Sequence, residues 1–487
     1  MKFMSTRGGE HDVDPSRAII NGIASDGGLY VPNSFPSLFN EIKEDMNLSY
    51  EDVAYKVISK FFDDLTEADL KDAIKDAYTG RFEVKEEKEF LELYHGPTSA
   101  FKDAALLFLP QIMKRAKVKC NVNGEVVILT ATSGDTGKAA LEGFKDIEGF
   151  KVVVYYPENG VSKIQYQQMA SQRGKNVKVI AIKGNFDNAQ TGVKEIFGDM
   201  EFRKLLGESG AKISSANSIN IGRLVPQIVY YFYGYLQLVN KQKIKMGDEI
   251  NVSVPTGNFG NILAAHYAKE MGLPIAKFIC ASNENNVLTD FFKTGVYDKR
   301  RELILTESPS MDILVSSNLE RLLFEASERK GNEIKKLMNS LNKDGVYIIP
   351  DEYKGFLEKF YGECATTEEV YEAIDKMYKE EGYLMDTHTA VAHVVKDKYV
   401  KETGDKKPCL VAATASPYKF PRSICNAIGL SVESLNDFEV VKLLNDETEV
   451  EIPENLKDLD KQEILHTEVW DKEDMRGALT SFLGVKA

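Results

Sequence analysis

The sequence predicts an α/β fold built on parallel strands. Strand-like and helix-like segments alternate between residues 125 and 182, and a second alternation begins near residue 250. Such alternation is typical of parallel strands joined by crossover helices. The chain has 487 residues, 43% of them hydrophobic, which indicates a globular protein too long for one ordinary core. We therefore expect two or three domains.

The expected elements follow from hydrophobic runs and the turn residues that flank them. Residues 1–80 form a first unit that ends in a helical, acidic stretch. Residues 285–385 are mostly charged helix and loop, and the highly charged residues 435–487 predict a surface extension. Strands are expected over 90–94, 126–129, 152–156, 177–182, 250–254, 277–281 and 407–413, and helices over 50–63, 66–78, 138–145, 163–173, 223–239 and 262–271.

Charge and composition exclude several classes of protein. The net charge is −14, from 75 acidic and 61 basic residues, and no dense Lys/Arg block is present, so nucleic-acid binding is not expected. There is no signal-peptide core and no apolar run of ~18 residues, which predicts a cytoplasmic protein without a membrane span. The five cysteines are widely spaced and the histidines form no His-Glu-x-x-His motif, so neither a disulfide framework nor a metal site is expected.

A lysine stands where a turn runs into an apolar helix. Residues 95–104 read His-Gly-Pro-Thr-Ser-Ala-Phe-Lys-Asp-Ala, in which Gly96 and Pro97 predict the turn and the residues after Lys102 predict a buried helix. Loss of hydration lowers the pKa of such an amine, and a Schiff base to an aldehyde cofactor requires a neutral amine. The alternative is a helix-start lysine whose ammonium group extends to water.

A glycine-rich loop follows the expected strand at 250–254. It comprises residues 257–261 and leads into a helix that ends at Gly272. Free backbone N–H groups and the positive end of the helix dipole suit a phosphate, which the glycines allow to approach closely. The loop matches neither Gly-x-Gly-x-x-Gly nor the P-loop pattern, so an ordinary strand-to-helix turn is the alternative.

A second loop of the same design spans residues 130–137, between a buried strand and a helix. Its hydroxyl and N–H groups suit an anion such as a carboxylate. Ser133, Asp135 and Thr136 are also good N-capping residues, so helix capping alone is the alternative.

Together, these three segments resemble threonine synthase, a family of pyridoxal-phosphate enzymes with the two-lobed tryptophan synthase β-like fold (fold type II). The resemblance covers about residues 5 to 430, and the number and order of its motifs make it specific. Further matching segments are residues 5–8, 26–32, 217–224, 386–391 and 413–420.

The resemblance implies a domain organisation. Residues 1–80 would be an N-terminal threonine-synthase-type domain, residues 81–434 the catalytic domain and residues 435–487 a C-terminal extension. A mobile smaller lobe is expected at about 126–244, with the cofactor between the two parallel-sheet lobes. That position agrees with the preference of ligands for the carboxyl ends of parallel strands. The assembly is expected to be a monomer or a homodimer.

The resemblance also implies roles around the cofactor, pyridoxal 5'-phosphate. Lys102 is the expected catalytic residue and carries the cofactor. The hydroxyl of Thr414, with Ser416 as second choice, is expected to face the ring nitrogen, and a strand-end threonine without that role is the alternative. The cofactor phosphate is expected on the loop residues Gly257, Asn258, Phe259, Gly260 and Asn261.

The substrate carboxylate is expected on the loop at 130–137. Some relatives have an asparagine where Asp135 stands, and a carboxylate there would repel the cofactor's phenolic oxygen. We therefore expect Asp135 either to point elsewhere or to share a proton. The residues of this expected site are Ser133, Gly134, Asp135 and Thr136.

The substrate phosphate needs cations of its own because the net charge of the chain repels it. Arg223 is the expected cation, since arginine suits bidentate phosphate recognition, and Lys163 is a second candidate. An ordinary ion pair is the alternative for Arg223. Further candidate donors to the substrate are Ser218, Asn220, Thr98 and Ser99.

The implied reaction belongs to threonine biosynthesis. O-phospho-L-homoserine and water give L-threonine and phosphate by γ-elimination and addition of water at the β-carbon, with Lys102 as the mobile acid–base group. A serine or threonine dehydratase of the same fold, which needs no second phosphate site, and a catalytically silent pyridoxal-phosphate-binding relative are the alternatives. The matches at 217–223 and in the N-terminal unit favour threonine synthase.

Overall fold

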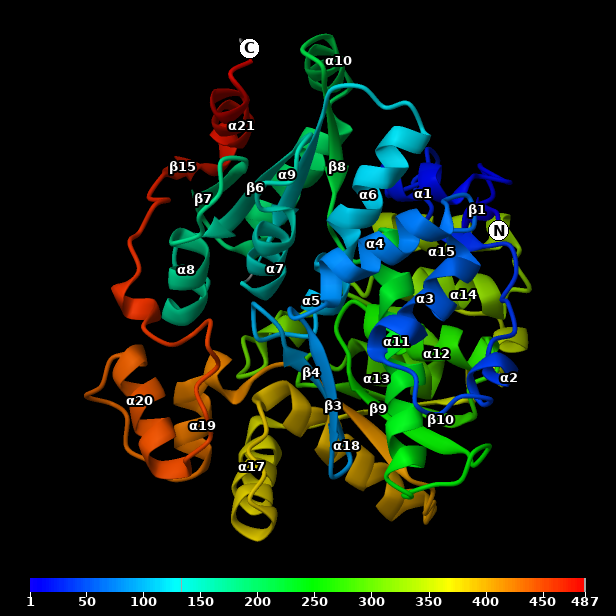
Figure 1. Cartoon of the computed structure of the whole chain (residues 1–487), viewed down its shortest axis with the longest axis vertical. Coiled ribbons are helices and arrows are strands. Elements are labelled where there is room, and N and C mark those ends of the chain that lie inside the picture. Colours follow the sequence, from blue (N-terminus) through cyan, green and yellow to red (C-terminus); the bar gives the residue numbers. More distant parts are fainter. Residues whose placement is uncertain (133, 486–487) are drawn as a thin grey trace.

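Two β-sheets organise the chain in this computed structural model, which describes residues 1–132 and 134–485 (Figure 1). Among these residues, every neighbouring pair of strands in both sheets is parallel except the pair at one edge of the larger sheet. The larger sheet has the order β13 (Phe360–Cys364), β10 (Ile275–Ser282), β9 (Ile250–Pro255), β14 (Cys409–Ala413), β4 (Phe90–His95) and β3 (Glu83–Glu87), with β3 antiparallel to β4.

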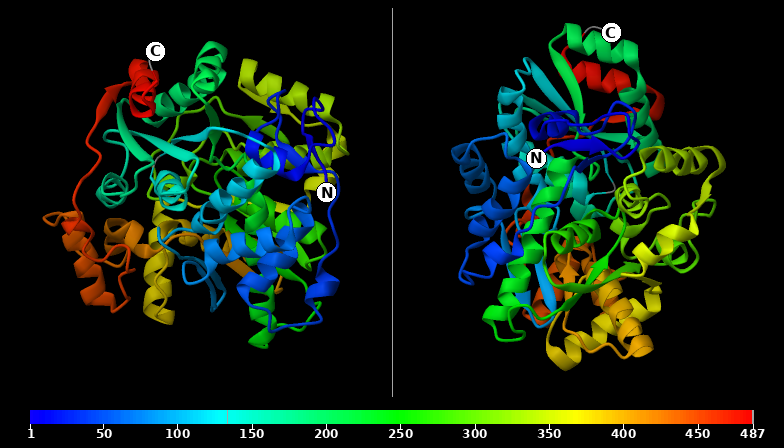
Figure 2. Two further views of the ribbon diagram at one scale, coloured as in Figure 1. Left: turned by 45° about the horizontal axis from the view of Figure 1, so that its top comes forward. Right: turned by 90° about the vertical axis from the view of Figure 1, so that its right-hand side faces the viewer.

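The smaller sheet lies beside the larger one in Figure 1, and Figure 2 shows the two units from other sides. Its strand order is β15 (Val469–Asp471), β7 (Val177–Lys183), β6 (Phe150–Pro157), β5 (Glu125–Ala131) and β8 (Ala211–Ser215). Its helices are α7 (Asp135–Phe144), α8 (Lys163–Ala170), α9 (Phe186–Gly198) and α10 (Met200–Glu208). The alternation expected from 125 to 182 is therefore present.

The N-terminal unit packs against the larger sheet's helices and shares their hydrophobic core. Capping boxes start its two long helices, with Ser49 and Asp52 at one and Thr66 and Asp69 at the other. These helices lie where the sequence predicted them. The unit comprises β1 (Phe3–Ser5), α1 (Pro15–Asn21), β2 (Tyr30–Pro32), α2 (Phe39–Ile42), α3 (Tyr50–Phe61) and α4 (Glu67–Tyr78).

The remaining helices and strands surround the larger sheet. The expected helix at 223–239 is α11 (Ile221–Asn240), and it packs against α3 and α12. By this packing, α11 belongs to the larger unit, although the sequence placed residues up to 244 in the smaller lobe. The others are α5 (Asp103–Leu106), α6 (Phe108–Lys119), α12 (Gly260–Glu270), α13 (Val287–Thr294), β11 (Val296–Asp298), α14 (Leu319–Ala326), α15 (Gly331–Asp344), β12 (Val346–Ile348), α16 (Lys354–Leu357), α17 (Thr367–Glu381), α18 (Thr387–Thr403), α19 (Pro421–Ala427) and α20 (Asp437–Thr448).

The C-terminal arm, residues 459–485, connects the two units and ends in α21 (Met475–Leu483). In Figure 1 it runs from beside α20 along α8 to the edge of the smaller sheet. There β15 pairs in parallel with β7, and Met475 and Leu479 are buried against the sheet. The sequence predicted a surface extension here. The structure differs for this arm, because its charged residues flank a strand and apolar side chains that complete the smaller unit.

Of the helices in the described part of the chain, none has the length and apolar character needed to cross a bilayer.

We expect the arm to contribute to the stability of the smaller unit. Leu479 is fully buried in a cluster with Val127 and Ile180, so Leu479→Ala should lower the free energy of unfolding by about 2–5 kcal/mol. The control is Leu465→Ala, because Leu465 lies on the same arm but is 43% exposed and should change stability by less than about 0.5 kcal/mol. Urea denaturation measures both, and equal stability of the two variants would contradict the packing of the arm.

Candidate active site

The segment that carries Lys102 is pinned against the end of the central strand β14. The amide of Phe101 donates to the carbonyl of Thr414 at 2.8 Å, and that of Ser416 donates to the carbonyl of Ser99 at 3.1 Å. Lys102 follows as the residue before α5, with 13% of its side chain exposed. Burial lowers the pKa of its amine to about 8. The ammonium group therefore does not extend to water, and the amine loses its proton close to neutral pH.

The turn before Lys102 is held by its own hydroxyl groups. Thr98 donates from its backbone and its hydroxyl to the carboxylate of Asp103, at 2.8 and 2.7 Å. Ser99 adopts a left-handed backbone conformation, φ 56°, and its hydroxyl donates to Asn455 at 2.8 Å. Both hydroxyls are thus engaged inside the protein, and their expected contact with substrate stays a prediction.

The expected phosphate loop joins β9 to the N-terminus of α12. Phe259 adopts the left-handed conformation, φ 62°, and the first turn of α12 contains no acidic residue. The side-chain oxygen of Asn261 accepts hydrogen bonds from Tyr230, at 2.7 Å, and from Tyr231. Its buried Nδ2 has no partner among the described residues. A helix start with an unpartnered amide N–H is suited to an anion.

Two neighbouring segments brace this loop. Asn318 donates from its backbone and side chain to the carbonyl of Asn258, at 3.1 and 2.9 Å, and also to the hydroxyl of Ser218 at 3.2 Å. Ser316 donates to the carbonyl of Gly257 at 2.7 Å. Ser218 therefore lies beside the loop at 257–261, and its expected role at the substrate phosphate stays a prediction.

Arg223 is a buried cation without a carboxylate partner in the described part of the chain. It is 3% exposed, and one of its terminal N–H groups donates to the carbonyl of Ala216 at 2.8 Å. Its Nε is buried and has no partner among the described residues. Burial lowers its pKa to about 10, so it remains charged at neutral pH. The alternative of an ordinary ion pair does not apply here, and the side chain has donor capacity for an anion.

Asn220, expected beside Arg223 at the substrate, is used as the N-cap of α11. Its oxygen accepts from the amide of Gly222 at 2.9 Å, and its Nδ2 donates to the carbonyl of Ile19 at 3.0 Å. The cap and the contact with α1 thus occupy both ends of this side chain. Lys163, the second candidate cation, is exposed at the start of α8.

The expected carboxylate loop precedes α7. Ser133 lies outside the described residues. The hydroxyl of Thr132 accepts the amides of Gly134 and Gly137, both at 2.9 Å, which fixes the loop's shape. Gly134 has φ 138°, and a Cβ there would lie 2.3 Å from the amide group of Gln165, so only glycine fits. Thr136, in the first turn of α7, is partly exposed.

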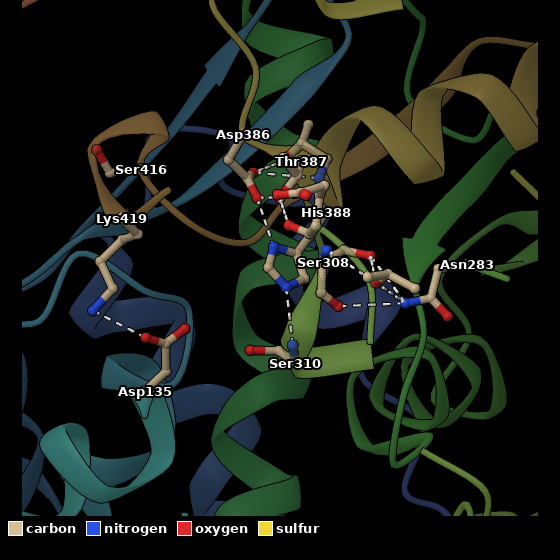
Figure 3. A network of polar contacts seen from close by, with 12 residues as sticks. Asp135, Asn283, Ser308, Ser310, Asp386, Thr387, His388, Ser416 and Lys419 are labelled. Atoms are coloured by element: carbon tan, nitrogen blue, oxygen red, sulfur yellow. Dashed lines mark hydrogen bonds and ion pairs between the residues drawn. The ribbon is translucent and has the colours of Figure 1, made fainter. Parts of the chain in front are cut away.

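Asp135 faces Lys102 as a carboxylate. Its Oδ2 lies 3.9 Å from Nζ of Lys102, and its Oδ1 lies 2.9 Å from Nζ of Lys419 (Figure 3). Burial opposes ionisation, but the positive charges of Lys419 and Lys102 lower its pKa well below the usual range. A second buried lysine thus compensates the charge of Asp135. Both expectations for Asp135, that it points away from the cofactor's phenolic oxygen or that it shares a proton, stay predictions.

The segment around Ser310 contacts Lys102 as well. Nζ of Lys102 donates to the hydroxyl of Ser310 at 3.4 Å, and the backbone amide of Ser310 donates to Nε2 of His388 at 3.2 Å. Nδ1 of His388 lies 2.9 Å from Asp386, so that nitrogen carries the proton (Figure 3). Sequence reasoning assigned no role to these three residues. The match at 386–391 contained two of them, but nothing linked them to the remote Ser310.

Thr414 presents a hydroxyl that no described residue hydrogen-bonds, at the end of β14 next to Lys102. The hydroxyl of Ser416, the second choice, accepts the amide of Tyr418 at 3.3 Å and so serves as a cap. An accepting hydroxyl can still donate its own hydrogen, so the assignment of Thr414 to the ring nitrogen, with Ser416 as second choice, stays a prediction.

Comparison with known proteins agrees with this geometry. The model "Threonine synthase N terminus" matches residues 2–78, "Pyridoxal-phosphate dependent enzyme" matches 90–415, and "Threonine synthase, C-terminal" matches 389–476. A crystal structure of PLP-bound threonine synthase from Brucella melitensis matches with a TM-score of 0.87 and 34% identity, covering 100% of each chain. The chain belongs to the threonine synthase family.

Relatives in this family differ in length. Threonine synthase of Saccharomyces cerevisiae is 36% identical over 451 residues, 84% of this chain and 86% of that protein. Threonine synthase-like 1 of Homo sapiens is 42% identical over 447 residues, 87% of this chain but 58% of that protein. The chain thus spans somewhat over half the length of the threonine synthase-like proteins it matches. The expected two-lobed fold type II architecture is confirmed by the structural match.

Pyridoxal phosphate is the cofactor of this family, and the described residues fit it. Lys102 offers an amine of lowered pKa. The loop at 257–261 offers a helix start with the unpartnered Nδ2 of Asn261. A Cβ at Gly260 would make only ordinary van der Waals contacts with the protein, the nearest at 3.6 Å to Asn318. We assign the cofactor phosphate to this loop as a proposal.

The first test concerns the lysine. Lys102→Ala should abolish the visible absorbance of protein-bound pyridoxal phosphate, because that absorbance requires covalent linkage to the amine. In the unmodified protein the rate of linkage should rise with pH, reach half of its maximum near pH 8 and level off at higher pH, where Lys102 is neutral. Lys138→Ala is the control, since burial also lowers the pKa of Lys138. Absorbance retained in Lys102→Ala would place the linkage elsewhere.

The second test concerns the phosphate loop. Gly260→Ala should leave the free energy of unfolding unchanged, because the added methyl makes only ordinary contacts with the protein. It should weaken binding of pyridoxal phosphate at least ~10-fold, since the methyl enters the space of the phosphate. Gly207→Ala, with no neighbour within 4 Å, is the control for fluorescence titration. Unchanged affinity in Gly260→Ala would mean that the phosphate binds at another place.

Proposed function

We propose that this protein is a threonine synthase that converts O-phospho-L-homoserine and water to L-threonine and phosphate. The observation that carries the proposal is Arg223, a buried guanidinium without a carboxylate partner in the described chain. Its charge lowers the pKa of Lys102, so it acts on the same site. The cofactor phosphate already has the loop at 257–261. A phosphorylated substrate needs a second anion site in addition to this loop, whereas the substrate of a dehydratase does not need one.

Substrate binding in this proposal divides among three groups of residues. The amides of Asp135 and Thr136, at the start of α7, receive the substrate carboxylate. Arg223 receives the substrate phosphate through its unsatisfied donors. It supplies local positive charge in a chain whose net charge of −14 would otherwise repel a phosphate. Lys102 lies between these elements, where its amine can reach the substrate carbon atoms that lose and gain protons.

Pyridoxal phosphate, when bound, supplies an electron sink for charge that develops on carbon atoms near the substrate amine. The proton transfers belong to Lys102, whose amine removes the α-proton, gives that proton up again and then removes a β-proton. Arg223 stabilises the phosphate as it leaves the γ-carbon. Lys102 returns a proton to the carbon chain, and water adds at the β-carbon. A positioned acid–base group of this kind contributes ~10²–10⁴-fold per step.

Product analysis separates this proposal from its alternatives. Purified protein with pyridoxal phosphate is given O-phospho-L-homoserine, and in parallel L-serine or L-threonine. Phosphate and L-threonine from the first substrate support the proposal. Keto acid from the second pair with no phosphate release would indicate a dehydratase. Bound cofactor without turnover of any of the three would indicate a catalytically silent relative.

The third test concerns the substrate phosphate. Arg223→Gln should raise KM for O-phospho-L-homoserine by ~10–100-fold, the equivalent of losing charge-assisted hydrogen bonds of about 1.5–3 kcal/mol. The Kd for pyridoxal phosphate should stay within about 2-fold, because the cofactor phosphate binds elsewhere. Arg115→Gln is the control, since Arg115 pairs with Asp76 near the surface and donates to the carbonyl of Gln111 on its own helix. An effect on kcat or on stability alone would mean that Arg223 does not hold the substrate phosphate.

A further inference from the structure

A buried ion pair joins the two units of the protein directly beside the catalytic lysine. Lys419 ends the short helix η3 (Pro417–Lys419) that follows β14 in the larger unit, whereas Asp135 begins α7 in the smaller one. Their side chains are 0% and 3% exposed, and Nζ lies 2.9 Å from Oδ1. Figure 3 shows Lys419 and Asp135 pointing toward one another. The pair therefore lies in the protein interior, where solvent does not screen it.

The surroundings of Lys419 satisfy its ammonium group. Besides Asp135, it donates to the side-chain oxygen of Gln168 and, at 3.3 Å, to the carbonyl of Thr98. Gln165 donates to the same Oδ1 of Asp135 at 3.1 Å. The ion pair thus has the additional hydrogen bonds that a buried pair needs to be stable.

One carboxylate faces two lysines with different tasks. While Oδ1 of Asp135 binds Lys419, its Oδ2 lies 3.9 Å from Nζ of Lys102. The charged groups that act on Lys102 are Asp135, Lys419 and Arg223. A lone buried carboxylate at this distance would favour the ammonium form of Lys102, whereas cations favour the neutral amine.

We infer that Lys419 is a positioning residue that balances the charge of Asp135, so that the carboxylate can stand beside Lys102 without fixing a proton on its amine. Asp135 in turn offsets the repulsion among the three cations Lys102, Lys419 and Arg223. In agreement, Asp135 raises the pKa of Lys102, whereas Lys419 and Arg223 lower it together with burial. The inference rests on Lys102 being the lysine that carries the cofactor, and not on which substrate the enzyme uses.

The two partners make opposite predictions for pH dependence. The readout is the pH midpoint at which the visible absorbance of the full-length protein loaded with pyridoxal phosphate changes. Lys419→Met should raise this midpoint by about one unit, because the charge of Asp135 then acts alone. Asp135→Asn should lower it by about one unit, because only cations remain. In the double variant, which removes one charge of each sign, the midpoint should return to within about 0.3 unit of the unmodified protein.

A second readout does not depend on the cofactor. Competitive acetylation of the cofactor-free, full-length protein across pH, followed by mass spectrometry of the Lys102 peptide, reports when that amine becomes neutral. The same opposite shifts and the same cancellation are expected. Urea denaturation should show each single variant to be less stable than the double variant, because each leaves one buried charge without its partner.

A less buried ion pair elsewhere in the protein serves as the control, with side chains that are 11% and 31% exposed. Lys396 and Glu89 lie 2.6 Å apart, and their charges are not among those that act on Lys102. Lys396→Met should lower stability but leave the absorbance midpoint and the acetylation midpoint of Lys102 unchanged. A purely structural role for Lys419 would give this same result.

Three outcomes would overturn the inference. The first is that the midpoints of Lys419→Met and Asp135→Asn move in the same direction. The second is that Lys419→Met leaves the midpoint unchanged. The third is that the double variant keeps the shift of either single variant. If Lys419→Met does not fold, Asp135→Asn and the double variant decide, and a midpoint of Asp135→Asn at or above that of the unmodified protein would overturn the inference. The inference fails independently of the proposed reaction, which is tested by phosphate release.

Discussion

The burial of one amine is the constraint on which the rest of the structure depends. Lys102 can be removed from water only because hydrogen bonds from Phe101 and Ser416 fasten its segment to the end of β14. This position brings the lysine to the carboxyl end of a parallel sheet, where the turns of neighbouring strands converge. Around it, the protein places groups of fixed charge and donors without partners, so that binding anions there requires little rearrangement of protein dipoles.

Electrostatic compensation at this site is local. The chain as a whole is acidic, with a net charge of −14, yet the groups nearest the amine include two further buried cations and one buried carboxylate. Asp135 would be unfavourable next to an anionic ligand if Lys419 did not neutralise it. Arg223 has no such partner in the described chain, so its charge is available. One buried site therefore holds a compensated pair and an uncompensated cation, which serve different purposes.

Local patterns in the sequence were enough to predict the α/β fold, most strands and helices, and the glycine loop that leads into α12. They were not enough for contacts between remote segments. Ser310 is 208 residues from Lys102, and Asn455 is 356 residues from Ser99, so no periodicity or spacing could connect them. The same limit applies to Asn220, whose residue type fits both a substrate donor and a helix cap, a choice that only its tertiary contacts decide.

The C-terminal arm has a consequence for how the chain folds during synthesis. Strand β7 is complete long before its neighbour β15 exists, since Lys178 and Glu468, which pair at this edge, are 290 residues apart. At ribosomal speeds, that delay is roughly 15–60 s. During it, the smaller sheet has an open edge, which is a template for wrong pairing. Pairing of β15 with β7 thus removes an aggregation hazard as well as completing the sheet.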